Sequence, residues 1–222
     1  MTAHQERAIA QLKKHLLTLS ARVEEAVRAA VKSLEDRDAR LAQQVIEGDT
    51  EIDKREVEIE EECLKILALF QPVASDLRFI VTVLKINDGL ERIADVAVNI
   101  AERSLFLAPR KQPEIFFNFP VMAQKAQAML KHSLDALVEW DTDLARRVCA
   151  DDDEVDTMNR EMYEQTKAEL RKGAEDVDTL IHLLSVSGHL ERVADLATNI
   201  AEDVVYLVEG EIVRHRTEDF ES

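Results

Sequence analysis

The chain of 222 residues carries 28 lysines and arginines against 45 aspartates and glutamates, which gives a formal net charge of −17. Such a chain repels nucleic acid and anionic lipid, and no basic stretch stands apart from the acidic background. A cation or a basic protein surface is a more natural partner. Hydrophobic residues make up 46% of the chain, which excludes a disordered protein, and the presence of only 5 glycines and 4 prolines favours helices over sheets.

Two features indicate where the protein resides. The cysteines, Cys63 and Cys149, are too few for a disulfide scaffold and lack the spacing of a metal site, so both are expected to be buried free thiols of an intracellular protein. The N-terminus is polar and lacks the apolar core of a signal peptide, and no apolar run approaches the roughly 20 residues of a membrane span. We therefore expect a cytoplasmic protein without a membrane span.

Few turn-forming residues interrupt the first half of the chain, and they predict three helices. Gly48 is expected to end the first helix, with Asp49 or Thr50 capping the second. A Gln-Pro pair at 71–72 ends the second helix, because proline cannot continue a helix and restricts the residue before it. The expected helices cover residues 3–47, 49–69 and 75–107.

The second half follows a segment with three prolines. Pro109, Pro113 and Pro120 mark residues 108–120 as a linker. Beyond it the helical pattern resumes, and Gly173 separates the last two helices. The expected helices cover residues 121–149, 153–172 and 176–214.

The two halves are copies of one unit. Residues 90–95, Leu-Glu-Arg-Ile-Ala-Asp, recur 100 positions later as Leu-Glu-Arg-Val-Ala-Asp, and the Asn-Ile-Ala-Glu of residues 99–102 recurs at the same separation. Upstream, Ile52-Asp53 matches Val155-Asp156 at a separation of 103 residues instead of 100. The two halves therefore differ in length, and the difference falls in the loop before the third helix of each half. The sequence thus predicts an all-α fold of two homologous antiparallel three-helix bundles (six helices), side by side with pseudo-twofold symmetry. Its expected parts are residues 1–107, a linker 108–120, and residues 121–222.

The third helix of each half carries an acidic stripe. Its members share spacings of i, i+4, i+8 and i+11, which place them within an arc of roughly 80° on one helix face. They are Glu91, Asp95, Asn99 and Glu102 in the first half and Glu191, Asp195, Asn199 and Glu202 in the second. The second helix of each half adds an acidic pair at i, i+4, Asp49 with Asp53 and Asp152 with Asp156.

These stripes predict metal-ion sites. Like charges at i, i+4 destabilise a helix by about a few tenths of a kcal/mol per pair, and facing stripes would repel one another unless a cation lay between them. Oxygen donors suit Mg²⁺, Ca²⁺, Mn²⁺ and iron, and helical bundles build metal sites from inward carboxylates. Arg92 and Arg192 are expected to form salt bridges to the stripes, or to hold an anion beside the metal. The charge run 56–62 is interpreted as a solvated face.

Other interpretations compete with a metal site. A single Glu-x-x-x-Asp is usually a solvated helix face, although two copies with the same flanking Asn and Glu favour a retained function. A second alternative is a metal-free helical adaptor whose acidic stripes dock on basic partner surfaces. A third is a carboxylate-bridged metal oxidase. The absence of Glu-x-x-His, of a nucleophile–base pattern and of a Gly-rich phosphate loop speaks against an enzyme.

The motifs resemble those of the PhoU family, accessory and regulatory proteins of bacterial phosphate transport. The resemblance rests on residues 71–78, Gln-Pro-Val-Ala-Ser-Asp-Leu-Arg, and on the doubled segments 90–102 and 190–203. It extends through Tyr206-Leu207 to residues 210–215 and covers essentially the whole chain. The second half lacks an equivalent of Gln-Pro-x-Ala before Asp176.

The resemblance implies iron or zinc clusters held by the Glu/Asp-x-x-x-Asp pairs. Carried over residue by residue, these pairs are Asp49, Asp53, Glu91 and Asp95 in one half and Asp152, Asp156, Glu191 and Asp195 in the other. Asn99, Glu102, Asn199 and Glu202 would be further ligands. It also implies a negative regulator of phosphate uptake and of the phosphate-starvation response. Such a regulator acts between the ATPase subunit of the phosphate ABC transporter and a sensor histidine kinase. It would be a homodimer that is peripheral, through these partners, at the inner face of the membrane.

Overall fold

The computed structural model describes residues 3–111, 119–174 and 176–211, and these residues form six α-helices and no strand. The prediction of an all-α fold is thereby confirmed. The helices are α1 (Ala3–Glu35), α2 (Ala39–Phe70), α3 (Ala74–Leu107), α4 (Phe119–Glu139), α5 (Thr142–Arg171) and α6 (Val177–Glu209). The expected end of the last helix, Arg214, lies outside the described residues, and so does most of the expected linker.

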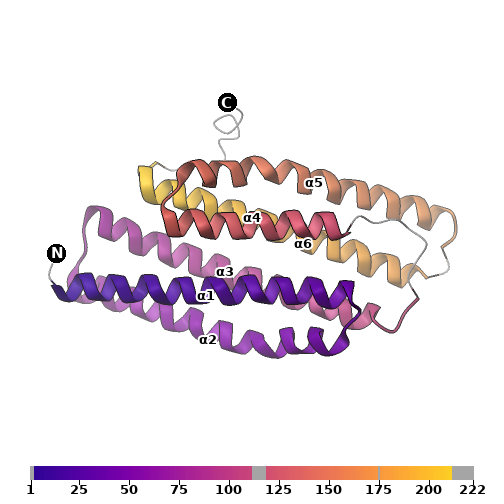
Figure 1. Ribbon diagram of the computed structural model, residues 1–222, viewed down its shortest axis with the longest axis horizontal. Coiled ribbons are helices and arrows are strands. Elements are labelled where there is room, and N and C mark those ends of the chain that lie inside the picture. The colour runs from indigo at the N-terminus through magenta and orange to yellow at the C-terminus, as the bar shows by residue number, and fades with distance from the viewer. Residues whose placement is uncertain (1–2, 112–118, 175, 212–222) are drawn as a thin grey trace.

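Two three-helix bundles lie side by side, as predicted (Figure 1). Helices α1–α3 pack on one another, as do α4–α6, and each helix is antiparallel to the next along the chain. The bundles meet through α3 and α6 at the centre and through a smaller contact between α1 and α4. Helices α2 and α5 are therefore the outermost, and each lies against the central helix of its own bundle.

The helix boundaries differ from the prediction at one turn in each half. Gly48 lies inside α2, and the chain turns instead at Arg37, which has a left-handed φ of 54°. Asp38 caps α2 by accepting hydrogen bonds from the backbone N–H groups of Arg40 and Leu41. An aspartate N-cap satisfies helix N–H groups that otherwise lack partners, so it can start a helix without a nearby glycine or proline.

The second half repeats this turn at Trp140, whose φ is 60°. Asp141 caps α5, with its Oδ1 accepting from the N–H of Leu144 at 2.9 Å, so the predicted helix over 121–149 is in fact two helices. The other predicted breaks are confirmed. Helix α2 ends just before residues 71–72, and Gly173 lies between α5 and α6.

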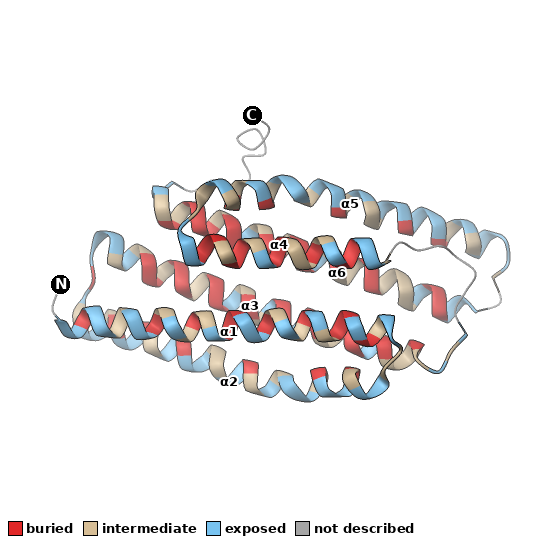
Figure 2. Ribbon diagram, in the orientation of Figure 1, coloured by how far each residue is buried: buried red, intermediate tan, exposed pale blue. Residues whose placement is uncertain are grey.

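Burial concentrates on the two central helices (Figure 2). Ile93 and Ile100 of α3 are fully buried, as is Val193 of α6, because these helices pack against neighbours on several sides. Each nevertheless keeps one face only partly covered, and the acidic stripe lies on that face, with its members half-buried or exposed. No helix in the described ranges is both long and apolar enough to cross a membrane. Both cysteines are free, although Cys149 is only half-buried.

An ion pair joins the two bundles. The ammonium of Lys85 on α3 lies 2.6 Å from the Oδ1 of Asp203 on α6, whose side chain is only 5% exposed. Lys85 also lies over the ring of Tyr206, at 5.2 Å from the ring centre. A cation that closes on a buried carboxylate and an aromatic face fixes the register of α3 against α6.

Candidate metal centre

The structure brings the two predicted acidic pairs of each half together in one cleft. In the first half the cleft lies between α2 and α3, and in the second between α5 and α6. Because the paired helices are antiparallel, Asp49 faces Asp95 and Asp53 faces Glu91. Each cleft thus contains a quartet of carboxylates. We call them the first quartet (Asp49, Asp53, Glu91, Asp95) and the second quartet (Asp152, Asp156, Glu191, Asp195).

The second quartet is the tighter of the two. Asp152, Asp156 and Asp195 each offer a carboxylate oxygen, and these oxygens all lie within 4.8 Å of one another. The three residues are half-buried, and the Oδ1 of Asp152 is buried without a hydrogen-bond partner among the described residues. A group of three anionic oxygens at this separation, beside a buried carboxylate oxygen without a donor among the described residues, fits a hard cation.

Burial, and after it electrostatic repulsion, raises the pKa of two carboxyl groups in the second quartet. Burial raises the pKa of Asp152 from 3.8 to about 7, with further contributions from Asp195 and Asp156. Burial also raises the pKa of Glu191, and Asp195 and Asp156 add to the shift. A proton or a metal ion must therefore compensate part of this charge near neutral pH.

The first quartet is more open. Asp53 and Asp95 are exposed, and no three carboxylate, imidazole or thiol ligand atoms of this cleft gather within 4.8 Å in the described part of the chain. Asp49 of this quartet nevertheless resembles its counterpart Asp152 in its pKa and in its buried oxygen. Burial, then Asp53 and Asp95, raise the pKa of Asp49 to about 6, and its Oδ1 is likewise buried without a partner. The two halves therefore repeat the same arrangement at different degrees of closure.

Two further carboxylates that the prediction left out border the first quartet. Asp88 and Glu56 contribute to the raised pKa of Glu91, after burial and Asp95. Glu56 also accepts a hydrogen bond from the Nδ2 of Asn87 on α3 at 2.9 Å. The sequence spacing could have predicted both, because Asp88 precedes Glu91 by three residues and Glu56 follows Asp53 by three, and residues three apart lie on the same face of a helix.

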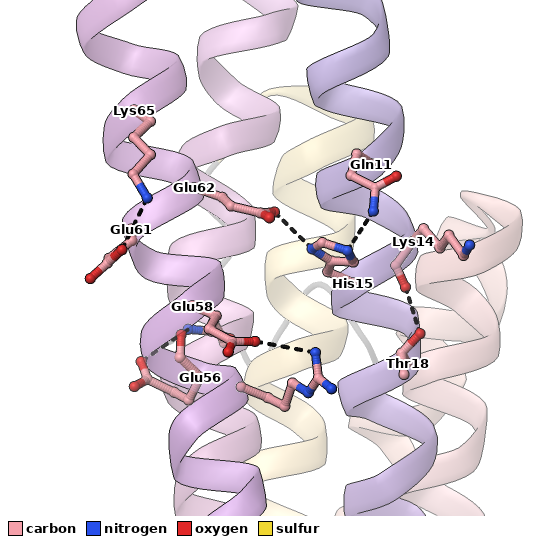
Figure 3. A network of polar contacts seen from close by, with 11 residues as sticks. Gln11, Lys14, His15, Thr18, Glu56, Glu58, Glu61, Glu62 and Lys65 are labelled. Carbon is pink, nitrogen blue, oxygen red and sulfur yellow. Dashed lines mark hydrogen bonds and ion pairs between the residues drawn. The ribbon is translucent and has the colours of Figure 1, made fainter.

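The charge run 56–62 is only partly a solvated face. Glu61 pairs with Lys65 on the surface of α2, as expected. Glu62, however, reaches α1, where its Oε2 lies 2.9 Å from the Nδ1 of His15, whose other ring nitrogen contacts Gln11 (Figure 3). These contacts join α1 to α2 and leave Glu62 outside the quartet.

Four of the predicted ligands lie outside the quartets. Asn99 donates its Nδ2 to the backbone carbonyl of Asp95 at 2.8 Å. Glu102 lies near His189 on α6, where its charge opposes the lowering of the imidazole pKa by burial and Arg103. Asn199 and Glu202 line a groove of about 510 Å³ between α3 and α6.

One of the two arginines beside the stripes forms the predicted salt bridge to its stripe. Arg192 contacts Asp195 at 3.2 Å, so it offsets part of the charge of the second quartet. Arg92 instead contacts Asp88 at 3.1 Å, one turn before it on α3. Both pairs are exposed, so each contributes little to stability by itself.

Both bundles match a known family of proteins. The model of the PhoU domain matches residues 16–104 and 119–204, one copy in each bundle. The chain belongs to the PhoU family. It is 36% identical over 210 residues to the "Phosphate-specific transport system accessory protein PhoU homolog" of Aquifex aeolicus, and the match covers 95% of each chain. It is 30% identical to the accessory protein PhoU of Escherichia coli, with 92% of this chain and 85% of that protein covered.

Solved PhoU structures share the fold. The crystal structure of PhoU from Pseudomonas aeruginosa superposes with a TM-score of 0.90 at 35% identity, covering 93% of this chain and 99% of that one. The phosphate transport system regulatory protein PhoU from Streptococcus pneumoniae gives a TM-score of 0.85 at 29% identity, covering 94% and 99%. The prediction of two PhoU repeats side by side is therefore confirmed.

Proposed function

We propose that this PhoU protein is a cytoplasmic negative regulator of phosphate uptake and of the phosphate-starvation response. It would act between the ATPase subunit of a phosphate ABC transporter and a sensor histidine kinase. The observation that carries the proposal is the match of both bundles to relatives named as accessory proteins of phosphate-specific transport, over nearly their whole length. The exposed charged faces of the described helices suit docking on such partners. We expect the working form to be a homodimer.

A deletion of the gene tests the regulatory role. We expect transcription of the phosphate-starvation genes to rise at high phosphate, where it is normally off, and to return to its low level when the wild-type gene is supplied. A strain that also lacks the sensor kinase should show no such rise, which separates the kinase pathway from a general stress response. Unchanged transcription in the single deletion at high phosphate would reject the role.

We further propose that the two quartets hold metal cations, with iron or zinc clusters as the leading candidates and Mg²⁺, Ca²⁺ or Mn²⁺ as alternatives. Support comes from the close approach of Asp152, Asp156 and Asp195 and from the buried, unpartnered oxygens of Asp49 and Asp152. A bound cation would neutralise the repelling carboxylates and clamp α2 to α3 and α5 to α6. The function of the metal would be structural or signalling, and no chemical step is assigned to it.

Elemental analysis of the purified protein tests the metal proposal. The variant Asp152→Asn with Asp156→Asn should lose the metal of the second quartet and keep its helix content. A matched control is Asp151→Asn with Asp153→Asn, because both aspartates are exposed on the same turns and the change in charge is the same. A wild-type protein without metal, and without heat on titration with iron or zinc salts, would favour the metal-free adaptor instead.

A further inference from the structure

The first bundle contains an apolar pocket between α1 and α2. The pocket has a volume of about 320 Å³. Its apolar walls come from α2 and α3 and consist of Leu41, Val45, Ile52 and Ala94. Three of these wall residues are buried, so the pocket reaches the core of the bundle. Two small residues, Ala26 of α1 and Gly48 of α2, also line it.

The internal repeat shows which side chain stands at the equivalent place in the second bundle. Residues of the first two helices recur 103 positions later, as the capping residues Asp38 and Asp141 do. The walls recur in kind, as Leu144, Val148, Val155 and, at the separation of 100 for the third helix, Ala194. Ala26, by contrast, corresponds to Met129, which is only 2% exposed. The first bundle therefore has the same walls without the unbranched apolar side chain of the second.

Positive charge lies beside the pocket on α1. Arg22 and Glu25 line both the pocket and a shallow depression farther along the helix, which Lys13 and Lys14 also line. Glu25 is paired with Arg28 at 2.7 Å. Lys13, Lys14 and Arg22 form no ion pair among the described residues. The face thus combines an apolar pocket with three cations that no carboxylate neutralises.

This charge runs against the composition of the chain. Helix α1 carries six lysines and arginines against four glutamates, whereas α2 carries four against nine acidic residues and the whole chain has a net charge of −17. In Figure 1 α1 lies at the front of its bundle, and no described helix covers it. An outward basic face on an acidic protein attracts an acidic surface and repels further copies of the overall charge.

We propose that this face of α1 binds an acidic protein segment that inserts one unbranched apolar side chain, such as methionine, into the pocket. The equivalent position of the second bundle supports the anchor, because Met129 is buried where the walls are of the same kind. The unpaired cations support the acidic flanks. Protein interfaces commonly concentrate affinity in an apolar anchor within a pocket and place charges around it. Asp49 also lines the pocket, but the inference depends neither on a bound metal nor on the regulatory role.

Fluorescence anisotropy with the full-length protein tests the proposal. The probe is a short labelled helical peptide with one methionine between glutamates. We expect saturable binding that weakens as the ionic strength rises. Serine in place of the methionine should weaken binding by about tenfold or more, because the apolar contact is lost. No saturable binding, or equal affinities for the methionine and serine peptides, would overturn the proposal.

The variant Ala26→Met closes the pocket with the residue that the second bundle carries. Its helical circular dichroism and urea midpoint should match or exceed those of the wild type. Its affinity for the methionine peptide should fall to that for the serine peptide. Ala68→Met makes the same change at an exposed position of α2 and should leave the affinity within about twofold. A folded Ala26→Met variant that still prefers the methionine peptide would reject the pocket.

A charge variant keeps the test valid if Ala26→Met fails to fold. Lys14→Gln with Arg22→Gln changes two exposed residues, so folding should be retained, and binding should weaken by about tenfold with a smaller dependence on salt. The matched control is Arg7→Gln with Lys32→Gln, because both residues are exposed on the same helix and line neither depression. Equal losses in the two double variants would contradict the proposal.

A second copy of this chain is the competing occupant of the face. Sedimentation of the wild type and of the Ala26→Met variant distinguishes the two, and we expect the same oligomeric state in both. A wild-type dimer that Ala26→Met dissociates, and that Ala68→Met leaves intact, would assign the face to a second copy and overturn the proposal.

Discussion

Replacing Asp152 by asparagine should stabilise the metal-free protein at pH 8, although the change removes a charged group from a helix. Asp152 lies in the second quartet with its Oδ1 buried, and burial together with Asp195 and Asp156 raises its pKa to about 7. As the pH rises above 4 the unfolded chain ionises at this residue before the folded protein does. The wild type therefore loses stability between about pH 4 and pH 7.

The size of this loss follows from the shift in acidity. A carboxyl whose pKa rises from 3.8 to about 7 would cost about 4 kcal/mol of unfolding free energy if the full linkage applied. Asp152 is only partly buried, and screening by solvent reduces the expected cost to about 1–2 kcal/mol. Asparagine keeps the shape of the side chain and removes the charge, so the variant should recover this amount at pH 8 and almost nothing at pH 4.

Urea unfolding in the presence of a chelator measures the effect. The midpoint of the Asp152→Asn variant should exceed that of the wild type at pH 8, the difference should vanish towards pH 4, and the slope of the transition should be unchanged. Asp153→Asn, an exposed neighbour with the same change in charge, should gain much less. When the metal is restored, the wild type should have the higher urea midpoint, because it gains binding energy that the variant lacks. A metal-free variant no more stable than the wild type at pH 8 would refute this reasoning.

Three further predictions concern stability, each measured by chemical unfolding. Asp141→Ala removes the N-cap of α5 and should cost about 1 kcal/mol, whereas Asp141→Asn should cost far less. Gly210→Ala and Gly173→Ala should each destabilise the protein by about 1–2 kcal/mol, because both glycines have left-handed φ values that a residue with a Cβ adopts only under strain. Ile93→Ala should cost about 2–5 kcal/mol, since this fully buried side chain lies at the centre of α3, and a loss below about 1 kcal/mol would contradict the packing.

Several features were predictable because they depend on local spacing. The i, i+4 carboxylate pairs placed Glu91 and Asp95 on one helix face, and the duplication predicted that their counterparts occupy an equivalent cleft. The prediction failed at the turns around Arg37 and Trp140. There an aspartate N-cap starts the next helix with no glycine or proline to mark the turn.

The sequence by itself determined that the protein is helical, that it is a tandem repeat, and that acidic residues line one face of its third and sixth helices. Only the tertiary structure decided which of these residues share a cleft. Asp95 faces α2, but Asn199 and Glu202 line the groove towards α3, because a stripe 80° wide on a central helix spans the space between two neighbours. The period of a helix fixes angles about its own axis. The positions of the surrounding axes follow from packing.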